Sequence, residues 1–383
     1  MLQNIMDQLI TEVRAVFLIA FLTILTGFAS AEEVATDSEK KFNAGELIIE
    51  HVADNHDWHI MGKGERSISM PLPVILYSKE RGLQSFMSSH FHHGEMAYRG
   101  YKLEHGKVVA VNEEGEIPAE QTTVNEELTA SLTDISITKN VAALFFSLIV
   151  LVWMFLSVAK SYGRRKGEAP KGMQSLLEPL IVFVRDDIAK ASIGPKYQKY
   201  LPYLLTVFFF IWINNLLGLI PILPGGANVT GNLAVTGTLA IITFLITTFS
   251  ANKHYWRHVF AMPGVPMAVL IILTPIEILG LFLRPFVLMI RLFANITAGH
   301  IIALSFFSLI FIFGEMSPGV GFGVSIVSVA FVIFMTLLEL LVAFLQAYVF
   351  TLLSAIYFGA ALEEHDTHHA HESDVHIEEA ALI

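Results

Sequence analysis

The sequence contains no cysteine and only a small share of charged residues. None of its 383 residues is cysteine, and Asp, Glu, Lys and Arg together make up 15%. The absence of cysteine excludes disulfide bonds, zinc–thiolate sites and thiol catalysis. The phosphate-binding pattern GxxxxGK followed by Ser or Thr is also missing, so nucleotide chemistry would have to take place on another chain. We expect neither a metal nor a cofactor.

The hydrophobic residues, in contrast, are too many for an ordinary soluble domain. They make up 54% of the chain, which predicts a protein that crosses the lipid bilayer several times. The charged residues are concentrated in the first 140 residues, in one loop and in the C-terminal tail. The formal net charge of −11 therefore gives no reason to expect a nucleic-acid partner.

The N-terminal segment resembles a secretory signal. The apolar run "AVFLIAFLTILTGF" is followed by "ASA" and two acidic residues, which predicts a signal peptide over residues 1–31 with cleavage after Ala31. The alternative is an uncleaved N-terminal span. Either reading sends residues 32–140 to the outer face, which indicates a periplasmic extension in a bacterial inner membrane.

Residues 32–140 are polar, acidic and rich in histidine. "SISMPLPVILYS" predicts strands interrupted at Pro71 and Pro73, so we expect a small extramembrane domain. The histidines of "HVADNHDWH" have spacings that match no helical pair of metal ligands. They are therefore interpreted as solvated or lightly packed side chains.

The first three spans follow from hydropathy. They cover about 141–159, 201–223 and 233–251, each close to the ~20 residues that a bilayer requires. The loop 160–200 carries nine Lys and Arg residues against four acidic ones, which predicts a cytoplasmic position. Within this loop, "SLLEPLIVFVRDDIAKASIG" is amphipathic and is expected to lie along the membrane surface.

Two later apolar segments are too long for ordinary spans. As single helices, residues 265–313 and 323–360 would reach roughly 70 and 57 Å, about twice the hydrocarbon thickness. Each is either two spans with a hidden turn or one long, tilted helix. We predict a strongly tilted hairpin with its turn at "GEMSPGVGFG", because the second segment has no proline, and no glycine between Gly323 at its start and Gly359. An acidic, His-rich tail (363–383) follows on the cytoplasmic side.

Polar residues inside these two segments are candidates for function, because ionisable groups at membrane depth are costly. At 100° per residue, Glu277, Arg284 and Arg291 share one face of the first helix, and Asn295 lies near it. His300 lies nine residues from Arg291 and therefore points to the opposite face. Glu339 and Gln346 share one face of the second helix. Arg284 also has a structural interpretation, as a side chain reaching toward an interface.

A histidine and a carboxylate on neighbouring helices can pass protons near neutral pH, because histidine titrates there. Arginine keeps its proton. Arg291 is therefore expected to attract a carboxylate or to block a leak.

Four motifs, in this order along the chain, resemble one known family. They are "EPLIVFVRDDIAKASIG", "NNLLGLIP", "PFVLMIRLFANITAGHIIAL" and "LELLVAFLQAYVFTLLSAIYFGAALEEH", and together they cover roughly residues 140–365. They resemble subunit a of F-type ATP synthases, the membrane stator subunit beside the rotating c-ring.

The resemblance implies two offset half-channels that meet at the c-ring, each open to one side of the membrane. It implies that Arg291 faces the ring carboxylate, with Asn295 and Gln346 near it, and that Glu277 and Asn215 occupy polar positions of the path. His300 and Glu339 take two channel positions that some bacterial members fill in the opposite order. Gly218 stands where some members carry Asp. The implied partners are the c-ring, the peripheral-stalk b subunits and the remaining subunits.

Two other classes of function remain as alternatives. A self-sufficient secondary transporter would bind an anion at Arg291, although no internal repeat of the kind that builds such transporters is visible. A purely structural scaffold would not explain the buried charges. Whether the ion is a proton or sodium depends largely on the ring, and a His/Glu relay favours the proton.

Overall fold

The computed structural model describes most of the chain between residues 44 and 363. The described residues are 44–45, 48, 53–61, 68–104, 106–164, 168–220, 226–262 and 265–363. The expected signal peptide and the tail from residue 364 onward lie outside them. Five helices of the described residues are long and apolar enough to cross a membrane. The predicted class of a polytopic helical membrane protein with a small N-terminal domain is confirmed.

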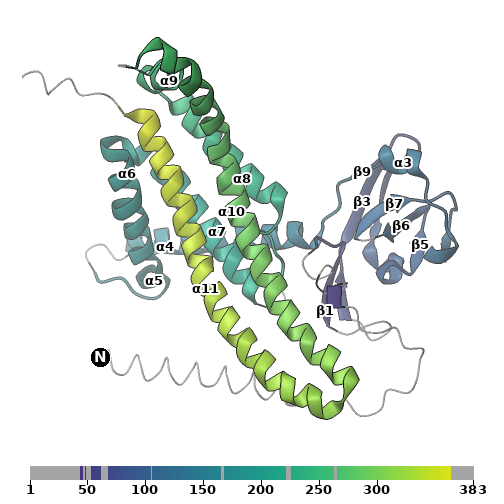
Figure 1. The fold of residues 1–383 in the computed structure, drawn as a ribbon. Coiled ribbons are helices and arrows are strands. Elements are labelled where there is room, and N and C mark those ends of the chain that lie inside the picture. The colour runs from purple at the N-terminus through teal and green to yellow at the C-terminus, as the bar shows by residue number, and fades with distance from the viewer. Residues whose placement is uncertain are drawn as a thin grey trace, which may run out of the picture. The chain divides into compact units, whose positions relative to one another are not determined.

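The N-terminal domain is built from short antiparallel strands in three small sheets (Figure 1). Its core consists of apolar side chains that alternate along the strands, as in Val74 and Leu76 of β3, together with Phe86, Phe91 and Tyr101. The strands are β1 (Asp57–Met61), β2 (Ile68–Pro71), β3 (Pro73–Ser78), β4 (Gly82–Met87), β5 (Met96–Tyr98), β6 (Tyr101–Glu104), β7 (Lys107–Ala110), β8 (Glu116–Pro118) and β9 (Thr133–Asp134), with the short helix α3 (Glu126–Ala130) before β9.

The two prolines lie where the sequence predicted interruptions. Pro71 ends β2 and Pro73 begins β3. A proline has no N–H to donate to a sheet, so it is tolerated at the end or the first residue of a strand.

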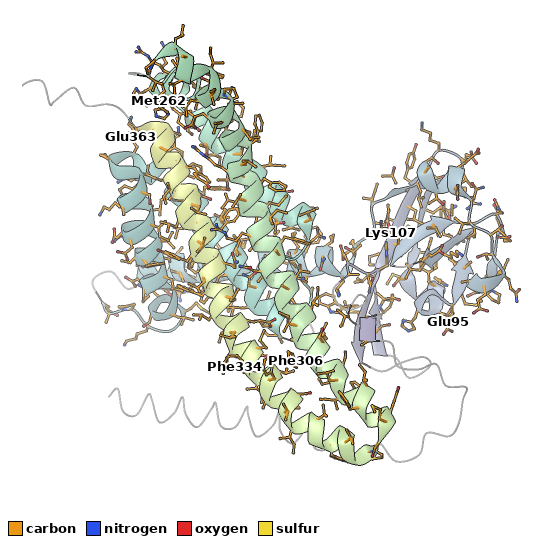
Figure 2. The ribbon with its side chains drawn as sticks, viewed as in Figure 1. Glu95, Lys107, Met262, Phe306, Phe334 and Glu363 are labelled. Atoms are coloured by element: carbon orange, nitrogen blue, oxygen red, sulfur yellow. The ribbon has the colours of Figure 1, made fainter. Side chains whose placement is uncertain are left out.

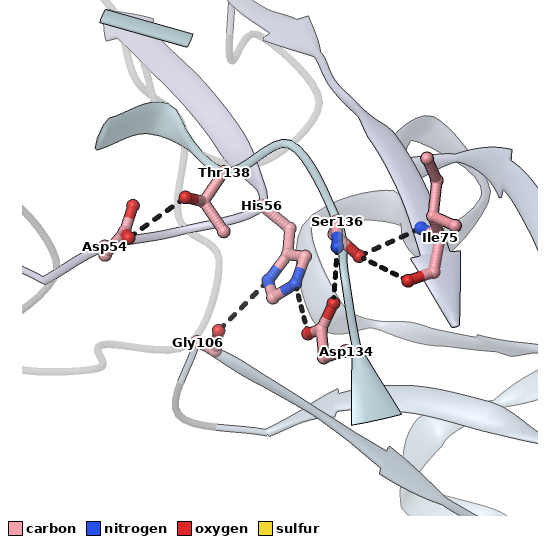
Figure 3. A network of polar contacts seen from close by, with 7 residues as sticks. All are labelled: Asp54, His56, Ile75, Gly106, Asp134, Ser136 and Thr138. Carbon is pink, nitrogen blue, oxygen red and sulfur yellow. Dashed lines mark hydrogen bonds and ion pairs between the residues drawn. The ribbon is translucent and has the colours of Figure 1, made fainter. Parts of the chain in front are cut away.

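A buried histidine ties the start of this domain to its end (Figure 3). His56 lies 2.8 Å through Nε2 from Oδ2 of Asp134 and 3.2 Å through Nδ1 from the carbonyl oxygen of Gly106. Both ring nitrogens face acceptors, so only the doubly protonated ring donates to both. Burial lowers the pKa of His56, but the hydrogen bond and charge of Asp134 outweigh it and raise the pKa overall. For Asp134, burial is likewise outweighed, and His56 and Ser136 lower its pKa.

The residues after Asp134 lead directly into the first long helix. The carboxylate of Asp54 accepts hydrogen bonds from the Thr138 hydroxyl and the Asn140 N–H, both at 3.0 Å. These contacts anchor the beginning of α4 (Lys139–Arg164). The sequence interpretation of the domain's histidines as solvated is wrong for His56, which is only 4% exposed.

The central helix of the membrane domain is α7 (Leu201–Leu219). Among the described residues it contributes the largest group of buried apolar side chains to the core, including Phe208, Phe209 and Ile211. The other elements before the hairpin are α5 (Met173–Phe183), the π-helical segment η4 (Val184–Lys190), α6 (Ala191–Ile193), the 3₁₀ segment η5 (Gly194–Lys199), α8 (Leu233–Ser250) and α9 (Lys253–Phe260). Asn232 and Asn252 cap the N-termini of α8 and α9 by accepting backbone N–H groups.

The last two helices form one long hairpin (Figure 1). Helix α10 (Met267–Met316) has 50 residues and α11 (Pro318–Leu362) has 45, so they extend about 75 and 68 Å. Each is one continuous helix, as predicted. Phe306 stacks on Phe331 across the hairpin, in the region where Figure 2 labels Phe306 and Phe334. At the other end, Asn252 donates to the carbonyl oxygen of Glu363 at 2.7 Å.

The hairpin turn is tighter than the sequence indicated. Only Ser317 separates the two helices, whereas the predicted turn spanned 314–323. The reason is the absence of side chains at Gly314 and Gly321, because a methyl group on Gly321 would lie 2.7 Å from Cα of Gly314. Helical hydrogen bonding therefore continues almost to the point of reversal.

Candidate functional site

The polar residues of α10 divide between two faces, as the helical geometry predicted. Arg291 is exposed on the surface of the helix, while His300 is half-buried between helices. The intervening Leu292 is almost fully buried, which fixes the rotation of α10 against its neighbours. The charged and the titratable group are therefore presented on different sides, about 14 Å apart along the axis.

Helix α11 approaches α10 closely beside Arg291. Gln346 is buried, and its side-chain amide donates to the backbone carbonyl of Arg291 at 3.4 Å. Ala343 and Ala347 are also buried, and their small side chains permit this approach. Gln346 thus contacts the arginine's backbone and holds the two helices in register at that level.

A cavity of about 280 Å³ lies between α7, α10, α11 and the loop before α8. It brings together four of the residues singled out from the sequence, and it adds three polar residues that were not. The predicted residues in its wall are Asn215, Asn295, His300 and Glu339; the additional ones are Asn214, Asn228 and Thr230. Side chains from three helices and a loop therefore surround one space.

Two glycines make room for the ionisable pair. Glu339 lies directly over Gly299, where a methyl group would come 2.5 Å from its Oε1. His300 lies against α7, with its Nε2 3.8 Å from the position that a methyl group on Gly218 would occupy. Oε1 of Glu339 is buried and has no hydrogen-bond partner among the described residues. This oxygen is therefore left to accept a proton or to bind a water molecule.

Asn215 connects the walls of the cavity. It accepts a hydrogen bond from the Thr230 hydroxyl at 2.5 Å and donates to the carbonyl of Ala343 at 3.2 Å. Helix α7, the loop before α8 and α11 are joined through this one side chain. Asn215 is buried. It therefore lines the cavity and, through its two hydrogen bonds, also holds the surrounding elements in place.

Asn295 shows that the two faces of α10 are less separate than a helical wheel predicts. It is exposed like Arg291, but it also lines the cavity with His300. The two positions are 140° apart on the wheel, and the cavity is wide enough to reach both.

Glu277 and Arg284 lie outside the cavity. Arg284 donates to the Tyr255 hydroxyl at 3.3 Å and lies over the ring of Tyr357 at 5.7 Å. These contacts pack Arg284 against two tyrosines and give it a structural role. Glu277 is half-buried and lies about 21 Å from Arg291 along α10, in the direction opposite to His300. The structure does not bring it together with the His300 and Glu339 pair.

The loop residues were missed because no periodicity marks them. Asn228 and Thr230 belong to "PGGANVTGN", which reads as an uncharged turn. Two features of the sequence could have indicated these residues. One is the group of amide and hydroxyl side chains in this loop between two apolar spans, and the other is the pair of asparagines in "NNLLGLIP". Within the described part of the chain, no group of three or more His, Asp or Glu residues could hold a metal ion.

Long apolar helices with ionisable groups held around a cavity between them define a multi-pass membrane protein of the ion-transporting class. The sequence profile of the ATP synthase A chain family matches residues 141–359, so the chain belongs to this family. A second profile, of a domain of unknown function, matches residues 47–135.

Curated bacterial proteins show the same relationship. The chain is 50% identical over 245 residues to ATP synthase subunit a 2 of Chlorobaculum tepidum, which covers 62% of this chain and 67% of that protein. It is 44% identical over 247 residues to ATP synthase subunit a of Chloroherpeton thalassium, covering 63% and 71%. Family membership gives the chain a stator role in an F-type ATP synthase, where it works with the other subunits of that complex.

Proposed function

We propose that this chain conducts protons between the two sides of a bacterial inner membrane and the c-ring of the synthase, through two offset half-channels. The observation that carries the proposal is the cavity in which His300, Glu339 and Asn215 meet from three helices. In the proposed path, His300 and Glu339 exchange protons with each other and with water in the cavity. A relay of this kind favours the proton as the transported ion, because histidine side chains in general can take up and release protons near neutral pH.

Arg291 has a different part in this proposal. Its exposure on α10 suits a group that faces a separate chain, and a fixed positive charge there would attract the ring carboxylate and prevent protons from passing directly between the half-channels. Asn295 and Gln346 flank it. Glu277, on the other side of Arg291, is assigned to the second half-channel. The peripheral-stalk b subunits would hold the chain against the rotating ring.

The proposed orientation places the N-terminal domain in the periplasm and the C-terminus in the cytoplasm. The basic loop 160–200 supports it, since that loop is then cytoplasmic and the loop before α8, which lines the cavity, is periplasmic. In this arrangement residues 32–140 form a periplasmic extension, preceded by a signal peptide.

Exchange of the relay pair tests the proposal. We expect the double variant His300→Glu, Glu339→His to retain more ATP-driven proton pumping than either single variant, because only the double variant keeps one histidine and one carboxylate in the cavity. ATP hydrolysis and the amount of assembled complex serve as controls. A double variant no better than the single ones would contradict the pairing.

The secondary-transporter alternative predicts that the purified chain alone moves an anion in liposomes. The exposed position of Arg291 weighs against it, because an anion-binding arginine would be expected inside the cavity.

A further inference from the structure

One side chain of the cavity has no partner for either of its polar atoms. Asn228, in the loop before α8, is 5% exposed and lines the cavity. Its side-chain nitrogen and oxygen are both buried, and neither has a hydrogen-bond partner among the described residues. Asn214 of α7 lines the same cavity, and its Oδ1 is unpartnered in the same sense.

Two neighbouring polar side chains of the same wall are satisfied, whereas Oε1 of Glu339 has no partner among the described residues. Asn215 and Thr230 bond to each other, and Asn215 also donates to α11. Buried polar groups of proteins are almost always hydrogen-bonded, to protein or to water, because an unpaired buried amide is destabilising. The two unpartnered amides, together with Oε1 of Glu339, therefore point to a ligand in the cavity.

The Asn228 side chain is also held in place by its loop. Ala227 and Val229 on either side of it are buried in an apolar cluster with Trp58 and Ala143. A methyl group on Gly231 would occupy the space of the Asn228 amide, so the loop conformation requires glycine at this position. The amide therefore lies against Gly231 and is held in the wall of the cavity by packing on both sides.

We propose that Asn228 binds water at the loop end of the cavity and is the residue through which the chain of water molecules reaches His300 and Glu339. The inference rests on the proposed function and adds to it the entry point. At about 280 Å³, against roughly 30 Å³ for a water molecule in the liquid, the cavity has room for several waters. The donor and acceptor of Asn228 and the acceptor of Asn214 supply the polar partners that such waters require.

Replacing Asn228 with leucine, an apolar side chain of broadly similar size, tests whether the cavity contains water. In a dry cavity the change removes an unsatisfied amide, so it leaves the protein as stable or more stable and proton flux unaltered. In a wet cavity it removes the first water-binding group of the path. We expect the flux per assembled complex to fall by roughly tenfold or more.

The control is the same replacement four residues further along the loop. Asn232 caps α8 and is not among the residues that line the cavity. Asn232→Leu disturbs the loop without touching the water path, so we expect near-normal flux per assembled complex. Equal losses in the two variants would overturn the inference, and so would wild-type flux in Asn228→Leu.

His300→Leu separates this inference from the proposed function. If His300→Leu abolishes flux while Asn228→Leu conducts normally, the relay stands and the entry point is wrong. If His300→Leu also conducts normally, the proposed function itself fails.

A labelling measurement gives a readout that does not depend on flux. The chain has no cysteine, so Asn228→Cys introduces a single thiol into it. The thiolate, which forms readily in water and poorly in apolar surroundings, attacks the sulfur of a methanethiosulfonate and displaces sulfinate to form a mixed disulfide. A small hydrophilic methanethiosulfonate is added to the assembled complex from the periplasmic side. We expect it to modify the thiol of the Asn228→Cys variant. Absence of labelling in native membranes, with labelling after denaturation, would overturn the inference.

Discussion

Gly299→Ala tests whether the carboxylate of Glu339 works where the structure places it. A methyl group at position 299 would come 2.5 Å from Oε1 and 3.2 Å from Cγ and Cδ of Glu339. An ordinary contact begins near 3.4 Å, so the carboxylate has to move by about 1 Å. A misplacement of this size in a reacting group costs on the order of 10²-fold in rate, which corresponds to about 2.7 kcal/mol of activation free energy.

The assay is ATP-driven proton pumping by the complete synthase in membrane vesicles, compared with its ATP hydrolysis. We expect Gly299→Ala to lower pumping by up to about 10²-fold while the complex still assembles, since alanine is by itself the better helix former by roughly 0.5–1 kcal/mol. Gly280→Ala, in the same helix, is the matched control, because a methyl group there meets nothing within 4 Å. Normal pumping by Gly299→Ala, in a protein that still requires Glu339, would refute the reasoning.

Two further predictions concern the hydrogen-bonded supports of the fold. The His56 and Asp134 pair should stabilise the N-terminal domain fully between pH values of about 3.8 and 6.5, the ordinary pKa values of the two groups. Its contribution is lost as pH rises through the raised pKa of His56, or falls through the lowered pKa of Asp134. Hydrogen exchange at β9 should therefore accelerate as pH rises above this window, beyond the intrinsic increase, and should not do so in His56→Gln. A double-mutant cycle of Asn215→Ala and Thr230→Val should give a coupling free energy of about 0.6–1.7 kcal/mol in thermal unfolding of the complex, and a value near zero would contradict the 2.5 Å hydrogen bond.

The long helices and the division of α10 into faces were predictable because both follow from local rules. Length against bilayer thickness indicated continuous helices, and 100° per residue separated Arg291 from His300. Neither rule depends on what the helix packs against.

The contacts between helices were not predictable in the same way. Glu339 and His300 line the same cavity because Gly299 and Gly218 leave space for them, and hydrophobic periodicity does not show which glycines face a neighbour. The register of α10 and α11 depends on tertiary packing around Leu292 and Gln346. The sequence alone therefore does not determine which residues of α10 and α11 lie side by side.

The contacts of loop residues were the least predictable from the sequence. Asn228 and Thr230 belong to no periodic segment, and their place in the cavity wall depends on how the chain returns from α7 to α8. His56 was likewise read as solvated because its partner, Asp134, is 78 residues away in sequence. Single-residue chemistry indicates which side chains are unusual in their surroundings, but the pairs they form appear only in three dimensions.

Proton pumping by a synthase that carries Arg291→Ala tests the central claim most directly. If Arg291 is the fixed charge that faces the ring and prevents direct passage between two half-channels, the complex assembles and hydrolyses ATP, but ATP-driven pumping is abolished. Normal coupled pumping by Arg291→Ala would contradict the assignment of this residue and the path built around it.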